Sequence, residues 1–179
     1  MRHVVLYHLN FDLTEFNQQA GRAGRDGAPA QIHLVYGQSD RRLNEYILAR
    51  TAPTLPTLRA IYRGLRELAR DGVLQSDADA IARTLDIDMA EAAAVNVALR
   101  IFEGARLLQC ERTDEGLFIR LLEVDHKVDL EQNERYAEGE AERKAFERYC
   151  TVALEFEASA LRTLINRPIY PRDARSSAP

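Results

Sequence analysis

The hydrophobic pattern near the amino terminus predicts a short strand–helix–strand unit. Residues 3–9 and 30–36 are short apolar runs of the kind that form buried strands. Between them, residues 14–20 predict a helix that begins at Thr14 as its N-cap. A loop is expected to follow, shaped by three glycines that also end the helix, namely Gly21, Gly24 and Gly27.

Helical periodicity continues in the next stretch of the chain. Ser39 and Asp40 are expected to cap a helix that runs to about Arg50, with four residues facing inward: Leu43, Tyr46, Ile47 and Leu48. Pro53 and Pro56 form a boundary, because proline cannot continue a helix. After that boundary, apolar residues recur on one face of a helix that Asp71 and Gly72 stop: Leu58, Ile61, Tyr62, Leu65, Leu68 and Ala69.

The following region predicts two more helices and a hairpin. The helices are expected at residues 76–85 and 89–104, and the hairpin at residues 106–112 and 117–124. Three helices followed by a two-stranded wing predict a winged-helix-like domain. An acid-rich helical segment is then expected over residues 129–165, with Gly139 as a candidate interruption.

These elements predict an α/β fold that becomes mostly α. The expected domains are a helicase-like α/β remnant over residues 1–52, a winged-helix-like domain over 53–125 and a C-terminal helical segment over 126–179. The 46% hydrophobic content is sufficient for a core, and no apolar run approaches the roughly 18 residues of a membrane span. Cys110 and Cys150 are too few for a disulfide framework, so a reducing cytoplasm is the expected compartment and no membrane partner is expected.

Charge is distributed unevenly along the chain. The net charge is −4, but residues 1–70 hold ten arginines against six acidic residues, a net charge of +4 that leaves −8 for the remainder. Such asymmetry favours an anionic partner for the N-terminal part. Four arginines share one face of the helix after Pro56, with Tyr62 at its edge: Arg59, Arg63, Arg66 and Arg70.

This arginine face has two interpretations. Most charged helix faces are simply solvated, and only Glu67 on this helix is available to pair with the arginines. Like charges at this spacing destabilise a helix by roughly 0.2–0.5 kcal/mol per pair, which a docked anion would relieve. The third helix, residues 89–104, is rich in alanine and poor in groups that read bases, so it favours packing over DNA recognition.

The loop after the first helix contains a glycine- and arginine-rich motif. Its defining residues are Gln18, Gly21, Arg22, Gly24 and Arg25, followed by Asp26 and Gly27. This pattern resembles the last motif of superfamily-two helicases, and the RecQ group most closely, in which the arginines face a nucleotide. The resemblance implies an arginine-finger role. The alternative is a vestigial loop whose arginines are solvated or hold carboxylates such as Asp26.

The rest of an ATP-driven helicase is not found in the sequence. No G-x-x-x-x-G-K-[ST] loop is present, and the stretch over residues 39–70, where the RecQ group carries cysteine zinc ligands, has no cysteine. His3, His8, His33 and His126 are dispersed, so no metal site is expected. We therefore expect no catalytic residue and no cofactor in this chain.

From Tyr36 onward the chain resembles the C-terminal region of RecJ, a single-strand-specific exonuclease of DNA repair. The resemblance rests on the order of elements, on residues 55–65, and on the runs Lys127–Glu131 and Arg135–Tyr136. It implies a non-catalytic interaction domain of a 5′–3′ exonuclease whose Mn or Mg ions lie in an upstream core. The partner it implies is the acidic tail of the single-stranded-DNA-binding protein, with a HerA-type translocase and weak single-stranded DNA binding as further candidates.

Two other hypotheses remain open from the sequence. One is the C-terminal part of a RecQ-like ATP-dependent helicase, with Arg22 and Arg25 acting on nucleotide bound by another lobe. The other is a free-standing winged-helix DNA-binding protein, although the acidic total charge counts against it.

Overall fold

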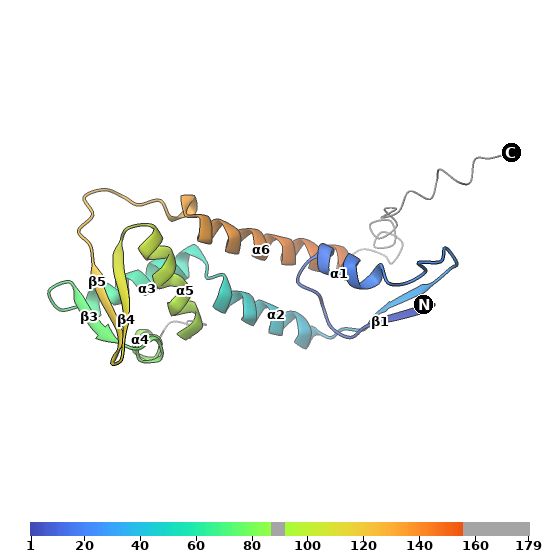
Figure 1. The fold of residues 1–179 in the computed structure, drawn as a ribbon, viewed down its shortest axis with the longest axis horizontal. Helices are drawn as coiled ribbons and strands as arrows, with labels where there is room; N and C mark the ends of the chain where they lie inside the picture. Colours follow the sequence, from blue (N-terminus) through green and yellow to red (C-terminus); the bar gives the residue numbers. More distant parts are fainter. Residues whose placement is uncertain (87–91, 156–179) are drawn as a thin grey trace. The chain divides into compact units, whose positions relative to one another are not determined.

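The computed structural model describes residues 1–86 and 92–155 (Figure 1). This part of the chain is mixed α/β and mostly helical, with six α-helices and two small sheets. It forms two compact units, one from residues 1–41 together with the chain from Ala145, the other from Arg42–Lys144. The units are not consecutive in sequence, because helix α6, Glu134–Cys150, begins in one and ends in the other.

The first unit is a strand–helix–strand element. Strands β1, His3–Leu6, and β2, Gln31–Leu34, pair in parallel, and helix α1, Leu13–Ala20, lies between them in sequence. Its core gathers apolar side chains from β1, α1 and the end of α6: Val4, Leu6, Leu9, Phe16, Ala20 and Tyr149. The rings of Phe16 and Tyr149 lie 5.8 Å apart and join the two helices.

Two predictions for this unit are corrected by the structure. The N-cap of α1 is Asp12, whose carboxylate accepts the backbone N–H of Glu15 at 2.7 Å, whereas Thr14 lies exposed inside the helix. The strands are shorter than expected and only half-buried, since alternate residues of β1 are exposed. Gly21 ends α1 as expected, and Gly24 and Gly27 adopt φ values of 61° and 84° that other residues rarely adopt.

Helix α2, Gln38–Thr51, has the expected inward face only in part, since Leu48 is buried as predicted but Leu43 is not. Asn44 and Leu48 are buried, whereas Leu43 is 56% exposed. Residues four apart share a helix face, so the burial of Asn44 with Leu48 directs Leu43 away from the core. The prediction that Leu43 faces inward is therefore wrong.

Helix α3, Leu55–Leu68, carries the expected apolar face. Thr54 caps it, and Leu58, Ile61 and Leu65 are completely buried. The helix ends before Arg70, whose backbone pairs with Val73 in a β-bridge across a turn. Arg70 therefore does not belong to the helical arginine face, contrary to the prediction. The cause is the turn at Asp71 and Gly72, both of which have positive φ.

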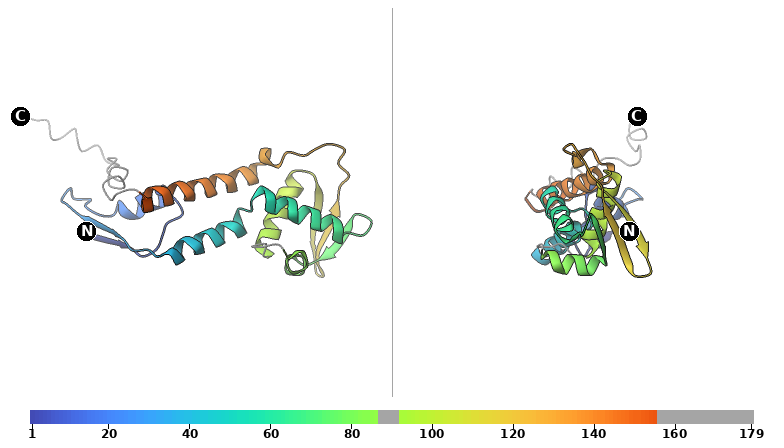
Figure 2. Two further views of the ribbon diagram at one scale, coloured as in Figure 1. Left: turned by 180° about the vertical axis from the view of Figure 1, so that it is seen from behind. Right: turned by 90° about the vertical axis from the view of Figure 1, so that its left-hand side faces the viewer.

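A strand that the sequence did not predict follows this turn. Strand β3, Val73–Ser76, pairs antiparallel with β5, Gly116–Leu121, which also pairs with β4, Leu108–Thr113. The resulting sheet has the order β3–β5–β4, and β4 and β5 form the expected hairpin (Figure 2).

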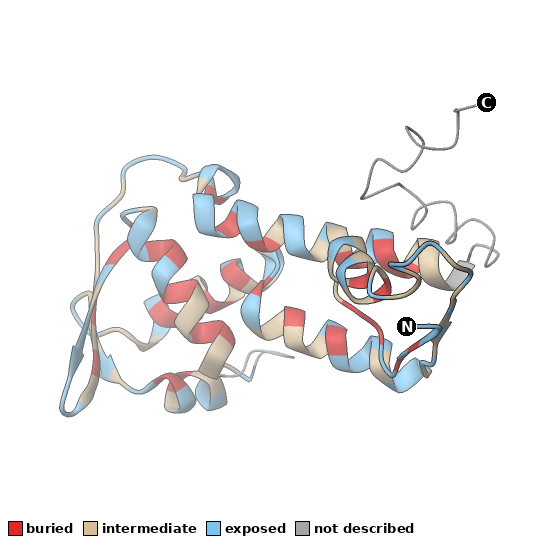
Figure 3. Ribbon diagram, turned by 45° about the vertical axis from the view of Figure 1, so that its right-hand side comes forward, coloured by how far each residue is buried: buried red, intermediate tan, exposed pale blue. Residues whose placement is uncertain are grey.

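Two helices pack beside this sheet in the second unit. They are α4, Ala78–Leu85, and α5, Ala92–Gly104, and the expected start of the latter at residue 89 lies outside the described residues. As predicted, α5 serves packing. Its buried residues are Ala94, Val95, Ala98, Leu99, Ile101 and Phe102, and buried positions are red in Figure 3. Leu117 and Ile119 of β5 join the same core.

A 3₁₀ turn, Leu130–Gln132, leads into α6, which a π-helical turn, Thr151–Glu155, extends. Gly139 was expected to interrupt this helix, but α6 runs through it without a break. It is buried where the helix passes Ala52 closely, and Arg143 donates hydrogen bonds to the carbonyls of Ala52 and Pro53. The expected continuation to residue 165 lies beyond the described residues. In the ranges 1–86 and 92–155, none of the helices combines the length and apolarity needed to cross a membrane.

Candidate functional site

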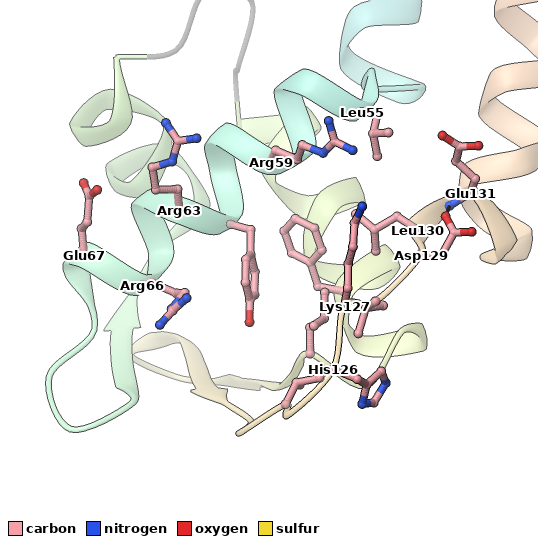
Figure 4. A pocket seen from close by; sticks show the side chains of 15 residues that line it. Leu55, Arg59, Arg63, Arg66, Glu67, His126, Lys127, Asp129, Leu130 and Glu131 are labelled. Atoms are coloured by element: carbon pink, nitrogen blue, oxygen red, sulfur yellow. Dashed lines mark hydrogen bonds between the residues drawn. The ribbon is translucent and has the colours of Figure 1, made fainter.

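A groove of about 1030 Å³ lies between α3 and the segment that follows β5 (Figure 4). One wall is the exposed side of α3, and the other is formed by residues 124–131. Both walls belong to the second unit, so the groove is complete within one compact body. The arginines that the sequence singled out thus border a concave surface, not a flat one.

Aromatic and aliphatic side chains form the floor of the groove. Tyr62 is half-buried and meets Phe102 edge-on, with ring centroids 5.2 Å apart. Phe102 is completely buried, and Leu55, Val128 and Leu130 border the floor. Such a floor accepts an apolar side chain, because it offers contact area that is already shielded from water on one side.

Cationic side chains stand on both walls. Arg59, Arg63 and Arg66 are exposed along α3, where their spacing places them on one face. Across the groove, Lys127 projects from the segment after β5, next to the imidazole of His126 (Figure 4). Within the described residues, none of the three arginines is paired with a carboxylate. These charges are therefore available to an anionic ligand.

Three acidic residues also line the groove, at its borders: Glu67, Asp129 and Glu131. Asp129 is engaged locally, since its carboxylate accepts the backbone N–H of Glu131 at 3.0 Å and the side-chain amide of Gln132 at 3.2 Å. His126 pairs with Asp125 at 2.9 Å on the exposed rim. The four cations Arg59, Arg63, Arg66 and Lys127 exceed the three lining carboxylates by one, so the groove itself favours an anion.

Sequence patterns predicted only one of the two walls of this groove. Arg59, Tyr62, Arg63 and Arg66 all border the groove, whereas Arg70 does not. Lys127 and the buried Phe102 were not expected to contribute, because they follow Arg59 by 40 residues or more in sequence. The second wall forms only because the chain after β5 passes alongside α3. No local sequence pattern predicts this path.

The helicase-like motif lies in the other unit. Gln18, Arg22 and Arg25 are exposed at the end of α1 and in the following loop. The loop is attached to β1, because the N–H of Gly24 donates to the carbonyl of Met1 at 3.0 Å. The carboxylate of Asp26 pairs with Arg2 at 3.0 Å, and its pKa is lowered by the backbone N–H of Ala28 and by Arg2.

The histidines and cysteines form no recognisable centre. Within residues 1–86 and 92–155, no three His, Cys, Asp or Glu side chains gather closely enough to hold a metal ion. His3 and His33 stack against each other with ring centroids 5.9 Å apart. Cys150 is buried, whereas Cys110 is half-buried, with its pKa raised by burial and by Glu103.

Comparisons with known proteins add no relative. The chain matches no protein-family model, no curated protein and no solved structure.

Proposed function

We propose that this chain is a non-catalytic protein-interaction domain from the C-terminus of a RecJ-type DNA-repair exonuclease. Its role would be to recruit the nuclease to single-stranded DNA by binding the acidic tail of single-stranded-DNA-binding protein. The observation that carries the proposal is the groove beside α3, which Arg59, Arg63, Arg66 and Lys127 line around the aromatic pair of Tyr62 and Phe102.

The groove suits an acidic peptide that ends in an apolar residue. Carboxylates of the tail would form charge-assisted hydrogen bonds with the guanidinium groups on α3. The apolar residue would pack on Tyr62 beside Phe102, in the manner of acidic-motif recognition by arginine clusters. Exposed ion pairs contribute little individually, so we expect roughly micromolar affinity that falls with salt.

The order of elements in the second unit supports a winged-helix-like domain. The succession α3, β3, α4, α5, β4, β5 places a three-stranded sheet around a hairpin wing. Helix α5, in the position of a recognition helix, buries six of its thirteen residues and is rich in alanine. Its remaining positions offer few of the Arg, Lys, Asn or Gln side chains that read bases, which favours docking of a protein over direct reading of DNA.

The test is titration of the chain with a fluorescent peptide of the acidic tail, followed by polarisation. Arg63→Glu combined with Arg66→Glu should weaken binding at least tenfold, because both charges on one wall are reversed. Lys127→Glu should weaken binding severalfold from the opposite wall. Circular dichroism should be unchanged, since all three side chains are exposed.

Arg70→Glu combined with Arg83→Glu is the matched control. Both residues are exposed and neither lines the groove, so this double variant carries the same charge change elsewhere on the second unit. It should bind as the parent does, apart from a small effect of net charge. If the control and the groove variant lose affinity equally, the peptide is attracted by charge alone and the proposed site is wrong.

A further inference from the structure

The exposed large apolar side chains of the first unit gather at its sheet. Val5 and Val35 are each 49% exposed, and Tyr7 is 78% exposed. The same strand directs Val4 and Leu6 into the core, so β1 has one covered and one uncovered face. Parallel sheets are normally covered on both faces. Exposed apolar side chains gathered in this way mark an interaction surface.

The outer edge of β1 is also open within the described residues. The carbonyls of Arg2 and Leu6 accept the N–H groups of Gln31 and Val35, each at 2.8 Å, so these residues direct their backbone groups toward β2. Backbone groups alternate along a strand, and those of His3, Val5 and Tyr7 therefore point to the opposite edge. The sheet that the structure describes has two strands, so this edge is unpaired there.

We propose that β1 pairs antiparallel with β1 of a second copy of this chain, with the two-fold axis at Val5. In this register Val5 lies opposite Val5 of the partner copy, and His3 lies opposite Tyr7. Each is a hydrogen-bonded pair that exchanges both backbone bonds. The pairing creates a four-stranded sheet and brings the two Val5 side chains into cross-strand contact. This inference concerns the first unit and does not rest on the docking groove.

The edge is self-complementary, as an isologous interface requires. Cross-strand pairs of β-branched and of aromatic side chains stabilise sheets, and no like charges meet along His3, Val5 and Tyr7. The strand also has no lysine, proline or bulge, which are the devices that protect natural sheet edges from pairing.

Charge favours a second copy over nucleic acid at this surface. Residues 1–41 contain four arginines and four acidic residues, so this part of the unit has no net charge to attract a polyanion. One of these arginines, Arg2, is paired with Asp26 next to the strand. The central side chain of the edge, Val5, is apolar, as side chains are in the core of a dimer interface.

The test measures mass against concentration by sedimentation equilibrium. The unchanged chain should shift from 20.3 kDa toward twice that mass as its concentration rises. Val5→Lys and Val5→Glu should each weaken dimerisation at least tenfold, because each variant places like charges opposite one another at the axis. An equimolar mixture of the two variants should dimerise again, since lysine then faces glutamate.

Val35→Lys is the matched control, because Val35 is equally exposed but lies beyond β2, away from the axis. This variant should dimerise as the parent does. A parent that stays at 20.3 kDa at the highest soluble concentration would refute the proposal. So would single Val5 variants that dimerise normally, or a mixture that remains monomeric while each variant keeps its circular dichroism spectrum.

Discussion

Tyr149 illustrates how one side chain supports the first unit. Its ring is completely buried against Phe16, at a point where α6 meets α1. Burial raises the pKa of its hydroxyl to about 12. The carboxylate of Glu15 also opposes ionisation, although its effect is smaller than that of burial. The native state therefore holds this proton more tightly than an unfolded chain, in which the pKa of tyrosine is about 10.

This difference predicts a loss of stability in alkali. The stabilising contribution of Tyr149 is complete below pH 10 and is lost as the pH rises from 10 to about 12, because only the unfolded state releases the proton in that window. The loss should be on the order of 2 kcal/mol. Thermal unfolding followed between pH 9 and pH 12 should show a shallower decline for Tyr149→Phe than for the parent. Tyr7→Phe, at an exposed site, should decline like the parent, and an equal slope for all three proteins would contradict the assignment.

At the scale of elements, periodic patterns located most of the helices correctly. Leu58, Ile61 and Leu65 recur at helical spacing and are all buried, so α3 was visible in the sequence. Strand β3 could not be predicted from the sequence, because it is four residues long and half-buried. Only its pairing with β5 makes it a strand. Burial of Asn44 instead of Leu43 likewise depends on tertiary packing, which local periodicity does not report.

The groove likewise combines residues that helical periodicity predicted and residues that only tertiary packing brings together. Three of its arginines and Tyr62 lie on a single helix, so helical spacing was sufficient to group them. Arg70 was grouped with them wrongly, because the turn at Asp71 ends the helix early. The wall carrying Lys127 depends on the path of an irregular segment, for which no periodicity exists.

Gly64 provides a test of packing at the element scale. It lies inside α3, where glycine is unfavourable, yet it is buried and the side chain of Leu85 fills the space that a Cβ would occupy. Gly64→Ala should therefore destabilise the protein by about 1–3 kcal/mol despite the better helix propensity of alanine. Glu67→Ala, at an exposed position of the same helix, should change stability by less than about 0.5 kcal/mol. Urea denaturation of both variants measures this, and a stabilised Gly64→Ala would show that α3 and α4 pack more loosely than described.

At the scale of the whole molecule, two units of different character share one chain. The first carries the helicase-like loop and the open sheet, and the second carries the groove. Local sequence patterns do not predict that residues 1–41 pack with the end of α6. They also do not predict the path of the loop that links β5 to α6. Packing of Tyr149 on Phe16 holds the first arrangement, and the side-chain amide of Asn133, which donates to the carbonyl of Ile101 at 3.3 Å, holds the end of the loop in the second.

The charge of the whole chain predicts how it meets DNA. Its net charge is −4, and the excess of positive over negative charge is confined to residues 1–70, so few phosphates can be neutralised at once. We expect single-stranded DNA to bind with a dissociation constant in the non-specific range of roughly 10⁻⁴–10⁻⁶ M, and to be released as salt rises. Fluorescence anisotropy with labelled oligonucleotides at several salt concentrations measures both properties. Nanomolar, sequence-selective binding to duplex at physiological salt would instead support a winged-helix DNA-binding protein.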